Sequence, residues 1–347
     1  MRIVVAGATF GRVYAEGVRA SRHDLVGIVG RGGADSQKLS HELGVPCFPP
    51  EEVPTDIDLA CVVIRSGITG GAGSELARAC ISKGIHVVQE QPVHLREMIE
   101  LMAAAKKAQV HYSVNAFYPY LRSVAALISA TKQLRGHEPI LLIEATTSLH
   151  VAYPFVNVLG RLAGGLKPFS LAYEGRLGGF ERLSGTVSGV PVSVNLYNEM
   201  SYTDPDNYAP AFMQFRVYVP SGVLALNDVF GPLLWTPRLH VDRRDFEKNV
   251  EGGVEVLEPP AASHGEMLAQ EWADGVKTML DLFEAHAHEP ARLQYQIAAC
   301  TAWQNMTAQL PPAGTDVPSD VEPMGKGFYT GPAFRVGTIR TMMQGAF

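Results

Sequence analysis

The first twenty residues, MRIVVAGATFGRVYAEGVRA (residues 1–20), decide the fold of this chain. Arg2–Val5 predicts a strand that begins almost at once, and Gly7 breaks it. Phe10–Ser21 then has the spacing of an amphipathic helix. A strand, a glycine turn and a helix in this order open a dinucleotide-binding fold.

The same alternation continues through the first third of the chain. Further strands are predicted at Asp24–Val29, Val45–Phe48, Leu59–Ile64, His86–Gln89 and Val110–Asn115. Helices are predicted between them at about Asp35–Leu43, from Gly73 to Gly84, and at Leu95–Ala108. Strands that alternate with helices at this spacing predict a parallel, doubly wound sheet, which is the Rossmann type of α/β fold.

The pattern changes after about residue 120. One strand is expected at Pro139–Thr146, and a helix follows at Val151–Leu162. Clustered strand-like runs come next, at Phe169–Tyr173, Gly185–Val187, Val192–Asn198, Phe212–Val219 and Gly222–Asp228. Long helices are expected at Glu266–Ala285 and Pro290–Gln309, and a loop from Pro311. We therefore expect a Rossmann domain at 1–120 and, at 121–347, an α+β domain with an open, mainly antiparallel sheet.

The composition excludes several classes of protein. The 347 residues carry 29 Lys and Arg against 35 Asp and Glu, a net charge of −6, so we expect neither a nucleic-acid partner nor an anionic membrane surface. No apolar run approaches the ~20 residues of a membrane span, and Gly7 comes too early for a signal peptide. The four cysteines stand alone, which favours free thiols in a reducing cytoplasm, and no metal site is expected.

The glycine turn is the predicted cofactor site. A full dinucleotide fingerprint has glycines at its first, third and sixth positions, whereas this turn has Thr9 and Arg12 at the third and sixth. A side chain at Gly7 is expected to fill the space through which a pyrophosphate approaches, and the next helix would offer free N–H groups to that pyrophosphate. The predicted contacts are Gly7, Ala8, Thr9, Phe10, Gly11 and Arg12.

The end of the second strand indicates which nicotinamide cofactor is used. An acidic residue there would bind the ribose 2′-hydroxyl of NAD, but this chain has Arg31, with Ser36 nearby. An arginine pairs well with a phosphate, so we predict NADPH. Asp35 argues against this preference if it faces inward, and a solvated charged loop is the alternative.

Residues 88–94, VQEQPVH, resemble the Glu-Lys-Pro segment of the glucose-fructose oxidoreductase/inositol dehydrogenase-like (Gfo/Idh/MocA) reductases. In the sugar-oxidising members of that family the lysine helps to remove a hydroxyl proton. Gln91 stands in its place here, and a neutral amide cannot do so.

A narrower resemblance is to the thiazolinyl imine reductases of siderophore pathways, and it runs to about residue 310. It rests on the segments at 7–14, 63–71, 90–94, 115–119, 146–148 and 204–207, and on GPLLWTPRLH at 231–240. The resemblance implies NADPH-dependent reduction of a thiazoline C=N bond to a thiazolidine, on a substrate tethered to a carrier domain of a peptide synthetase. It also implies cofactor contacts at Ser66, Glu90 and Gln91.

Such a reaction needs an acid near the imine nitrogen. His94 follows a strand end where ligands of open α/β sheets bind, and Tyr118 and Tyr120 follow the next strand. We predict all three as candidate acids and place Tyr118 before Tyr120. The alternatives are a helix cap for His94 and ordinary packing for the tyrosines.

His150, Trp235 and Arg238 of the second domain are expected to line the substrate pocket. Trp235 could stack on an aryl-thiazoline, although a core position is the alternative. The open sheet leaves a face to be covered, so we also expect a homodimer.

Two other functions remain open at this point. One is another sugar or polyol oxidoreductase of the wider family, against which Gln91 argues. The other is a nucleotide-binding sensor without catalysis, in which His94 and both tyrosines would be dispensable.

Overall fold

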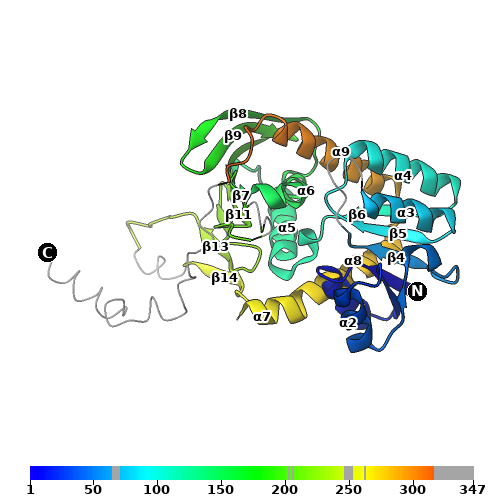
Figure 1. Cartoon of the computed structure of the whole chain (residues 1–347). Coiled ribbons are helices and arrows are strands. Elements are labelled where there is room, and N and C mark those ends of the chain that lie inside the picture. The colour runs from blue at the N-terminus through cyan, green and yellow to red at the C-terminus, as the bar shows by residue number, and fades with distance from the viewer. Residues whose placement is uncertain (65–70, 202–203, 205–206, 246–252, 262, 316–347) are drawn as a thin grey trace.

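Six parallel strands form the first sheet, as the alternating pattern predicted. The computed structural model describes residues 1–64, 71–201, 204, 207–245, 253–261 and 263–315 (Figure 1). The order across the sheet is β3 (Cys47–Phe48), β2 (Asp24–Val29), β1 (Arg2–Ala6), β4 (Leu59–Val62), β5 (His86–Glu90) and β6 (Tyr112–Asn115). The helices that connect them are α1 (Gly11–Arg19), α2 (Ala34–Leu43), α3 (Ala72–Ser82) and α4 (Leu95–Lys107). This order is that of a Rossmann domain.

The second sheet has eight strands and is mainly antiparallel, which confirms the predicted fold class. Its order is β14 (Glu255–Glu258), β13 (Leu233–Pro237), β12 (Gly222–Leu226), β11 (Met213–Val219), β7 (Leu142–Ser148), β10 (Val190–Tyr197), β9 (Phe180–Val187) and β8 (Phe169–Leu177). The pair β7 and β10 is parallel. α5 (Arg122–Arg135) and α6 (Ala152–Ala163) cover one face of this sheet, where the rings of Phe155 and Phe215 stack at 5.5 Å.

Two C-terminal helices return to the first sheet, as Figure 1 shows. The helix predicted at Glu266–Ala285 is observed as α7 (His264–Glu266), a π-helical turn at Met267–Glu271 and α8 (Trp272–His286). α8 packs so closely on α1 that a Cβ added at Gly17 would lie 2.5 Å from the Cβ of Val276. The backbone N–H of Val114 in β6 donates to Gln296 of α9 (Pro290–Thr307) at 3.1 Å. The domain boundary at residue 120 stays a prediction.

One α-helix and two strands were not predicted, namely α5, β13 and β14. The buried face of α5 includes Ser123 and Thr131, so its apolar stripe is weak. β13 ends in Pro237, and β14 is an edge strand in which Val256 is 61% exposed. No helix in the described ranges is both long and apolar enough to cross a membrane.

Candidate functional site

The candidate site lies where the carboxyl ends of the first sheet's strands face the second sheet. Glu90 ends β5 and Asn115 ends β6. Tyr118 begins the short helix η2 (Tyr118–Tyr120), and its ring centroid lies 6.4 Å from that of Phe212 in the second domain. Ligands of open α/β sheets bind at this end of the strands.

Gly7 forms the tight turn that the sequence predicted, but for a different reason. Its φ is +105°, and a Cβ added there would lie 2.3 Å from the carbonyl oxygen of Val63, which directly follows β4. A side chain would therefore strike the backbone beside β4 rather than a pyrophosphate, and the earlier explanation was wrong. Glycine is needed because two backbone segments approach each other here.

The turn between β1 and α1 offers free hydrogen-bond donors. Within the described part of the chain, no acceptor is found for the backbone N–H groups of residues 8–11. These groups surround the N-terminus of α1, where the helix dipole favours an anion. The turn therefore fits a dinucleotide pyrophosphate. The side chain of Arg12 points elsewhere, because it forms an ion pair with Glu42 of α2 at 2.7 Å.

The loop after β2 contains an exposed arginine and is followed by a serine whose hydroxyl already makes a hydrogen bond. Arg31 is exposed and has no ion-pair partner among the residues that the structure describes. Ser36 is 7% exposed, and its hydroxyl donates to the carbonyl of Gly33 at 2.9 Å. Asp35 is exposed in the first turn of α2. Arg31 is thus the better placed of the two predicted phosphate ligands.

A hydrogen-bonded chain of three residues lies behind the glycine turn. The hydroxyl of Tyr14 donates to the carboxyl of Glu90 and accepts from the side-chain amide of Asn115. Burial raises the pKa of Glu90 to about 8, although the hydrogen bonds from Tyr14 and Gln91 lower it. Glu90 is therefore largely a neutral acid at neutral pH. Gln91, predicted as a cofactor contact, has a buried Oε1 with no partner among the described residues.

The shifted carboxyl predicts a pH dependence of stability. A glutamate in the unfolded chain titrates near 4.5, while folded Glu90 titrates near 8. Between these values the folded state holds a proton that the unfolded state has released. The free energy of unfolding should then fall as the pH rises, by up to about 1.4 kcal/mol per pH unit.

Glu90→Gln keeps a neutral side chain and should remove this contribution. Urea unfolding of both proteins from pH 5 to pH 8 checks it, with Glu75→Gln, at an exposed position on α3, as the control. Equal slopes in the native protein and Glu90→Gln would contradict the raised pKa.

Tyr118 is buried between the two domains. Its ring is 9% exposed and lies 5.6 Å from that of Phe117. Burial raises the pKa of Tyr118, and the nearby carboxyl groups of Glu90 and Asp228 raise it further. The phenol holds its proton throughout the neutral range, as a free tyrosine also does, and burial makes it a weaker acid than a free tyrosine.

The other two predicted acids make contacts of their own. Tyr120 lies on the side of α6 and α9, where its hydroxyl is 3.4 Å from Arg292 and its ring is 5.9 Å from Arg161. His94 caps α4, since its Nδ1 accepts from the backbone N–H of Arg96 at 3.3 Å. His94 still begins the helix that follows Glu90 and Gln91, at the same end of the sheet.

The second domain brings His150 to the site through an aromatic row. The ring centroid of His150 lies 5.3 Å from that of Phe212, which in turn adjoins Tyr118. Burial lowers the pKa of His150 to about 4, so its imidazole is neutral at neutral pH. Its Nε2 is buried with no partner among the described residues.

Trp235 and Arg238 are not brought to this place. Trp235 lines a separate cavity together with Ala130 and Leu134 at the far end of α5, whereas that helix begins beside η2. At 1.5 Å per residue, Leu134 is roughly 18 Å along the helix from its first residue, Arg122. Arg238 lies further along the chain, and its N–H donates to Ser221 at 2.7 Å.

Sequence reasoning missed Tyr14, Asn115 and Asp228. Tyr14 and Asn115 are 101 residues apart, and no local pattern links them. Asp228 follows β12 and accepts from the backbone N–H groups of Phe212 and Met213 at 3.2 and 3.3 Å. A polar residue at the end of a strand, or two residues past it, was the available signal for Asn115 and Asp228. Ser66 lies outside the described residues.

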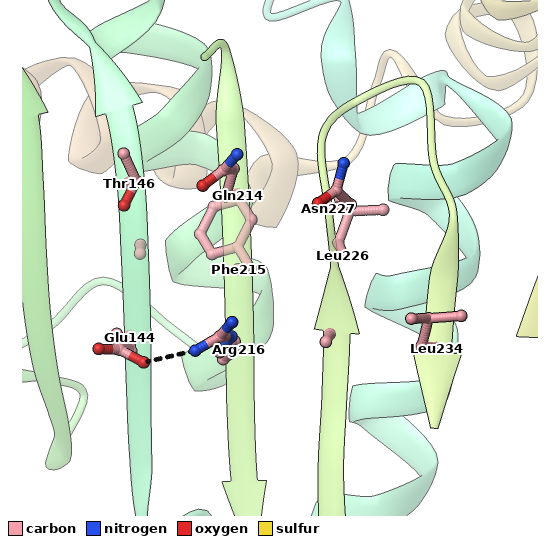
Figure 2. Close-up of a pocket in the computed structure, with 10 residues that line it drawn as sticks. Glu144, Thr146, Gln214, Phe215, Arg216, Leu226, Asn227 and Leu234 are labelled. Atoms are coloured by element: carbon pink, nitrogen blue, oxygen red, sulfur yellow. Dashed lines mark ion pairs between the residues drawn. The ribbon is translucent and has the colours of Figure 1, made fainter. Parts of the chain in front are cut away.

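A cavity of about 350 Å³ lies elsewhere, on the open face of the second sheet (Figure 2). Its lining comes from β7, β11, β12, β13 and the turn after β12. Glu144 and Arg216 form an ion pair there at 3.9 Å, and Tyr218 donates to Glu144 at 2.9 Å. This cavity has a mixed polar and apolar lining that comes from the second domain alone, so it is separate from the site around Tyr118.

Two families match successive parts of the chain. Residues 1–116 match the Gfo/Idh/MocA oxidoreductase family, described by its NAD-binding Rossmann fold. Residues 138–236 match the C-terminal domain of the thiazolinyl imine reductase Irp3-like family. A search of the curated proteins found no match.

Several solved structures share the fold at low identity. A UDP-N-acetylglucosamine 3-dehydrogenase, GnnA, from Acidithiobacillus ferrooxidans is 16% identical, with 89% of this chain and 97% of that chain covered and a TM-score of 0.63. A dehydrogenase from Chromobacterium violaceum is 13% identical, with 89% and 94% covered and a TM-score of 0.65. An oxidoreductase from Agrobacterium radiobacter in complex with NAD⁺, L-tartaric acid and magnesium is 10% identical, with 89% and 96% covered and a TM-score of 0.65.

Proposed function

The chain is an oxidoreductase of the Gfo/Idh/MocA type with an Irp3-like C-terminal domain, and from this premise we propose that it reduces a thiazoline C=N bond to a thiazolidine. The electron donor proposed is NADPH. The substrate proposed is a thiazoline held as a thioester on a carrier domain of a siderophore-producing peptide synthetase. The reaction adds a hydride to the imine carbon and a proton to the imine nitrogen.

The observation that carries the proposal is a site built to donate a proton. Tyr118 places a protonated phenol at the junction of the two domains, beside Phe212, and Gln91 stands at the position of the family's lysine. No lysine is found among the described residues that form the site. A phenol with no lysine beside it suits imine reduction better than alcohol oxidation, in which the family's lysine helps to remove a hydroxyl proton.

The cofactor would be held by the glycine turn and by Arg31. The backbone N–H groups of residues 8–11 would bind the pyrophosphate, and Arg31 would pair with the 2′-phosphate. When bound, NADPH would supply the hydride. Glu90 and Gln91 lie at the end of β5 beside the turn, which is consistent with contacts to the nicotinamide end.

The proton would come from Tyr118, with His94 as a partner in its delivery. Tyr118 is proposed to hold its proton at Oη until the nitrogen becomes a basic amine. His150 and Phe212 would form the second-domain wall against which the ring of the substrate packs. The apolar rings exclude water around the phenol.

The open face of the second sheet is proposed to pair with a second copy of the chain. An open sheet of this size leaves one face to be covered, and α5 and α6 cover the other face. The four cysteines are free, which is consistent with the reducing cytoplasm that we propose as the compartment.

The test is an assay of NADPH oxidation with a synthetic thiazoline thioester, run beside a panel of sugars and polyols. Turnover of the thiazoline, with a thiazolidine product identified by mass spectrometry, is expected. Turnover of a sugar or polyol alone would make the chain a dehydrogenase of the wider family. Tight binding of NADPH without turnover of any substrate would favour a sensor.

Arg31 should determine the preference for NADPH over NADH. A charge-assisted pair contributes about 1.5–3 kcal/mol, so Arg31→Ala should lower the ratio of the two affinities roughly tenfold or more. Fluorescence titrations with both cofactors measure the ratio. Arg19→Ala is the matched control, because it removes an exposed arginine from the opposite end of α1. Equal affinities for both cofactors in the native protein would contradict the assignment.

A further inference from the structure

The backbone just before Tyr118 is strained. Phe117 has φ 57° and ψ −67°, and the N–H of Tyr118 donates to the carbonyl of Ala116 at 2.7 Å. Together these make a γ-turn of the rare kind with a positive φ, which is a strained conformation for a bulky residue. Such a turn persists only where its surroundings hold it.

Asn115 provides one of the contacts that hold the turn. Its Oδ1 accepts from the backbone N–H of Phe117 at 2.9 Å, two residues along the chain. Its own carbonyl accepts from the N–H of Gln91 at 3.3 Å, and its side chain is 3% exposed. The Phe117 ring is also held by neighbouring rings, since its centroid lies 5.2 Å from that of Phe10 and 5.5 Å from that of Trp272.

The Tyr14–Glu90 pair determines which end of the Asn115 amide faces the turn. The Tyr14 hydrogen is donated to Glu90, so the Tyr14 oxygen is left as an acceptor. The Asn115 NH₂ group therefore turns toward Tyr14, and its oxygen is left to face Phe117. An amide in the opposite orientation would set its NH₂ group against the Phe117 N–H, two donors with no acceptor.

We infer that Asn115 is a positioning residue, which clamps the turn at Phe117 and so holds the Tyr118 phenol where proton delivery needs it. This inference rests on the proposed function, because it assumes that Tyr118 is the acid. It adds to that function a buried series of hydrogen bonds that runs from Glu90 through Tyr14 and Asn115 to the backbone just before Tyr118. None of the three residues needs to touch the substrate.

Three variants separate the contributions of the individual hydrogen bonds in this series. Asn115→Ala removes both side-chain bonds and should lower kcat about 10²-fold, with KM and NADPH affinity little changed, because a small displacement of the acid is enough. Asn115→Asp keeps an oxygen for the Phe117 N–H and should recover most of that loss. Tyr14→Phe removes the hydrogen bonds of the Tyr14 hydroxyl with Glu90 and Asn115 but leaves the Asn115 Oδ1 bond to Phe117, so its loss of kcat should be smaller than that of Asn115→Ala.

Asn157→Ala is the matched control for a buried asparagine. Asn157 is also 3% exposed, and its Oδ1 accepts from Arg161 at 3.0 Å on α6. Its loss should reduce thermal stability while kcat stays near native. Similar kcat losses in Asn157→Ala and Asn115→Ala would show a general effect of buried asparagines and overturn the inference.

A double variant tests whether Asn115 acts through Tyr118. When the phenol is already absent, Asn115→Ala should cause no further loss in Tyr118→Phe, since groups that act as one unit are not additive. A loss equal to the product of the two single losses would overturn the positioning role. Native kcat in Tyr118→Phe alone would instead overturn the assignment of the acid.

A measurement without substrate or cofactor tests the positioning of Tyr118 independently of its proposed role as the acid. NMR of the full chain with ¹³Cζ-labelled tyrosine identifies the Tyr118 resonance by its absence in Tyr118→Phe. That resonance should shift or broaden in Asn115→Ala and stay in its native position in Asn157→Ala. A native Tyr118 resonance in folded Asn115→Ala would overturn the clamp, whatever the reaction proves to be.

Discussion

Tyr118→Phe should lower kcat for thiazoline reduction by about 10²–10⁴-fold, the usual effect of removing a positioned general acid. The loss should appear mainly in kcat, because the proton moves only as the C=N bond is reduced. NADPH affinity should barely change, since the substitution leaves the glycine turn and Arg31 intact. Steady-state kinetics with the thiazoline thioester, together with an NADPH titration, measures both quantities.

His94 and Tyr120 provide the comparisons for this experiment. If His94 and Tyr118 deliver the proton as one relay, His94→Asn combined with Tyr118→Phe should be no worse than the poorer single variant. Tyr120→Phe should be near native, because its hydroxyl contacts Arg292 on α9. A larger loss in Tyr120→Phe than in Tyr118→Phe would identify Tyr120 as the acid. Native kcat in both His94→Asn and Tyr118→Phe would exclude both residues.

Gly7→Val should abolish NADPH binding by disrupting the turn between β1 and α1. The new Cβ would lie 2.3 Å from the Val63 carbonyl oxygen, and a β-branched residue is strained at a φ of +105°. We expect the first domain to lose about 2–5 kcal/mol of stability while the second domain remains folded. Enhancement of NADPH fluorescence on binding, with circular dichroism melting curves, measures the two effects.

Gly84→Val is the matched control for the glycine turn. Gly84 also has a positive φ, +78°, but a Cβ there would meet no described atom within 4 Å. This variant carries the backbone strain without the collision, so it should still bind NADPH. Unchanged NADPH binding by a folded Gly7→Val protein would place the nucleotide elsewhere.

The elements that sequence analysis predicted well are those whose burial is periodic. β4 is buried throughout and β2 begins and ends where the pattern placed it, so the parallel sheet followed from spacing alone. α5 was missed because it buries Ser123 and Thr131 alongside its apolar residues, and exposed β14 buries little that a pattern could reveal. Patterns of hydrophobicity predict a helix or strand only where that element buries apolar residues at regular intervals.

For the site, the sequence indicated residue types at strand ends but not which of them meet. Glu90 and Tyr118 were both named, yet their proximity and their raised pKa values came from packing. Trp235 was named as well, and the fold places it at the far end of α5. A side chain's partners depend on how distant segments pack, which local spacing does not encode.

The sequence by itself determined the Rossmann sheet, the position of the glycine turn, Arg31 in place of an acid and Gln91 in place of a lysine. These are local properties, set by residue type, periodicity and distance along the chain. Only the tertiary structure decided that Tyr14, Glu90 and Asn115 form one buried chain, and that Tyr118 faces Phe212 while Tyr120 faces α9. The physical reason is that desolvation and hydrogen-bond geometry arise where distant segments exclude water together, and they fix the protonation and orientation of each group.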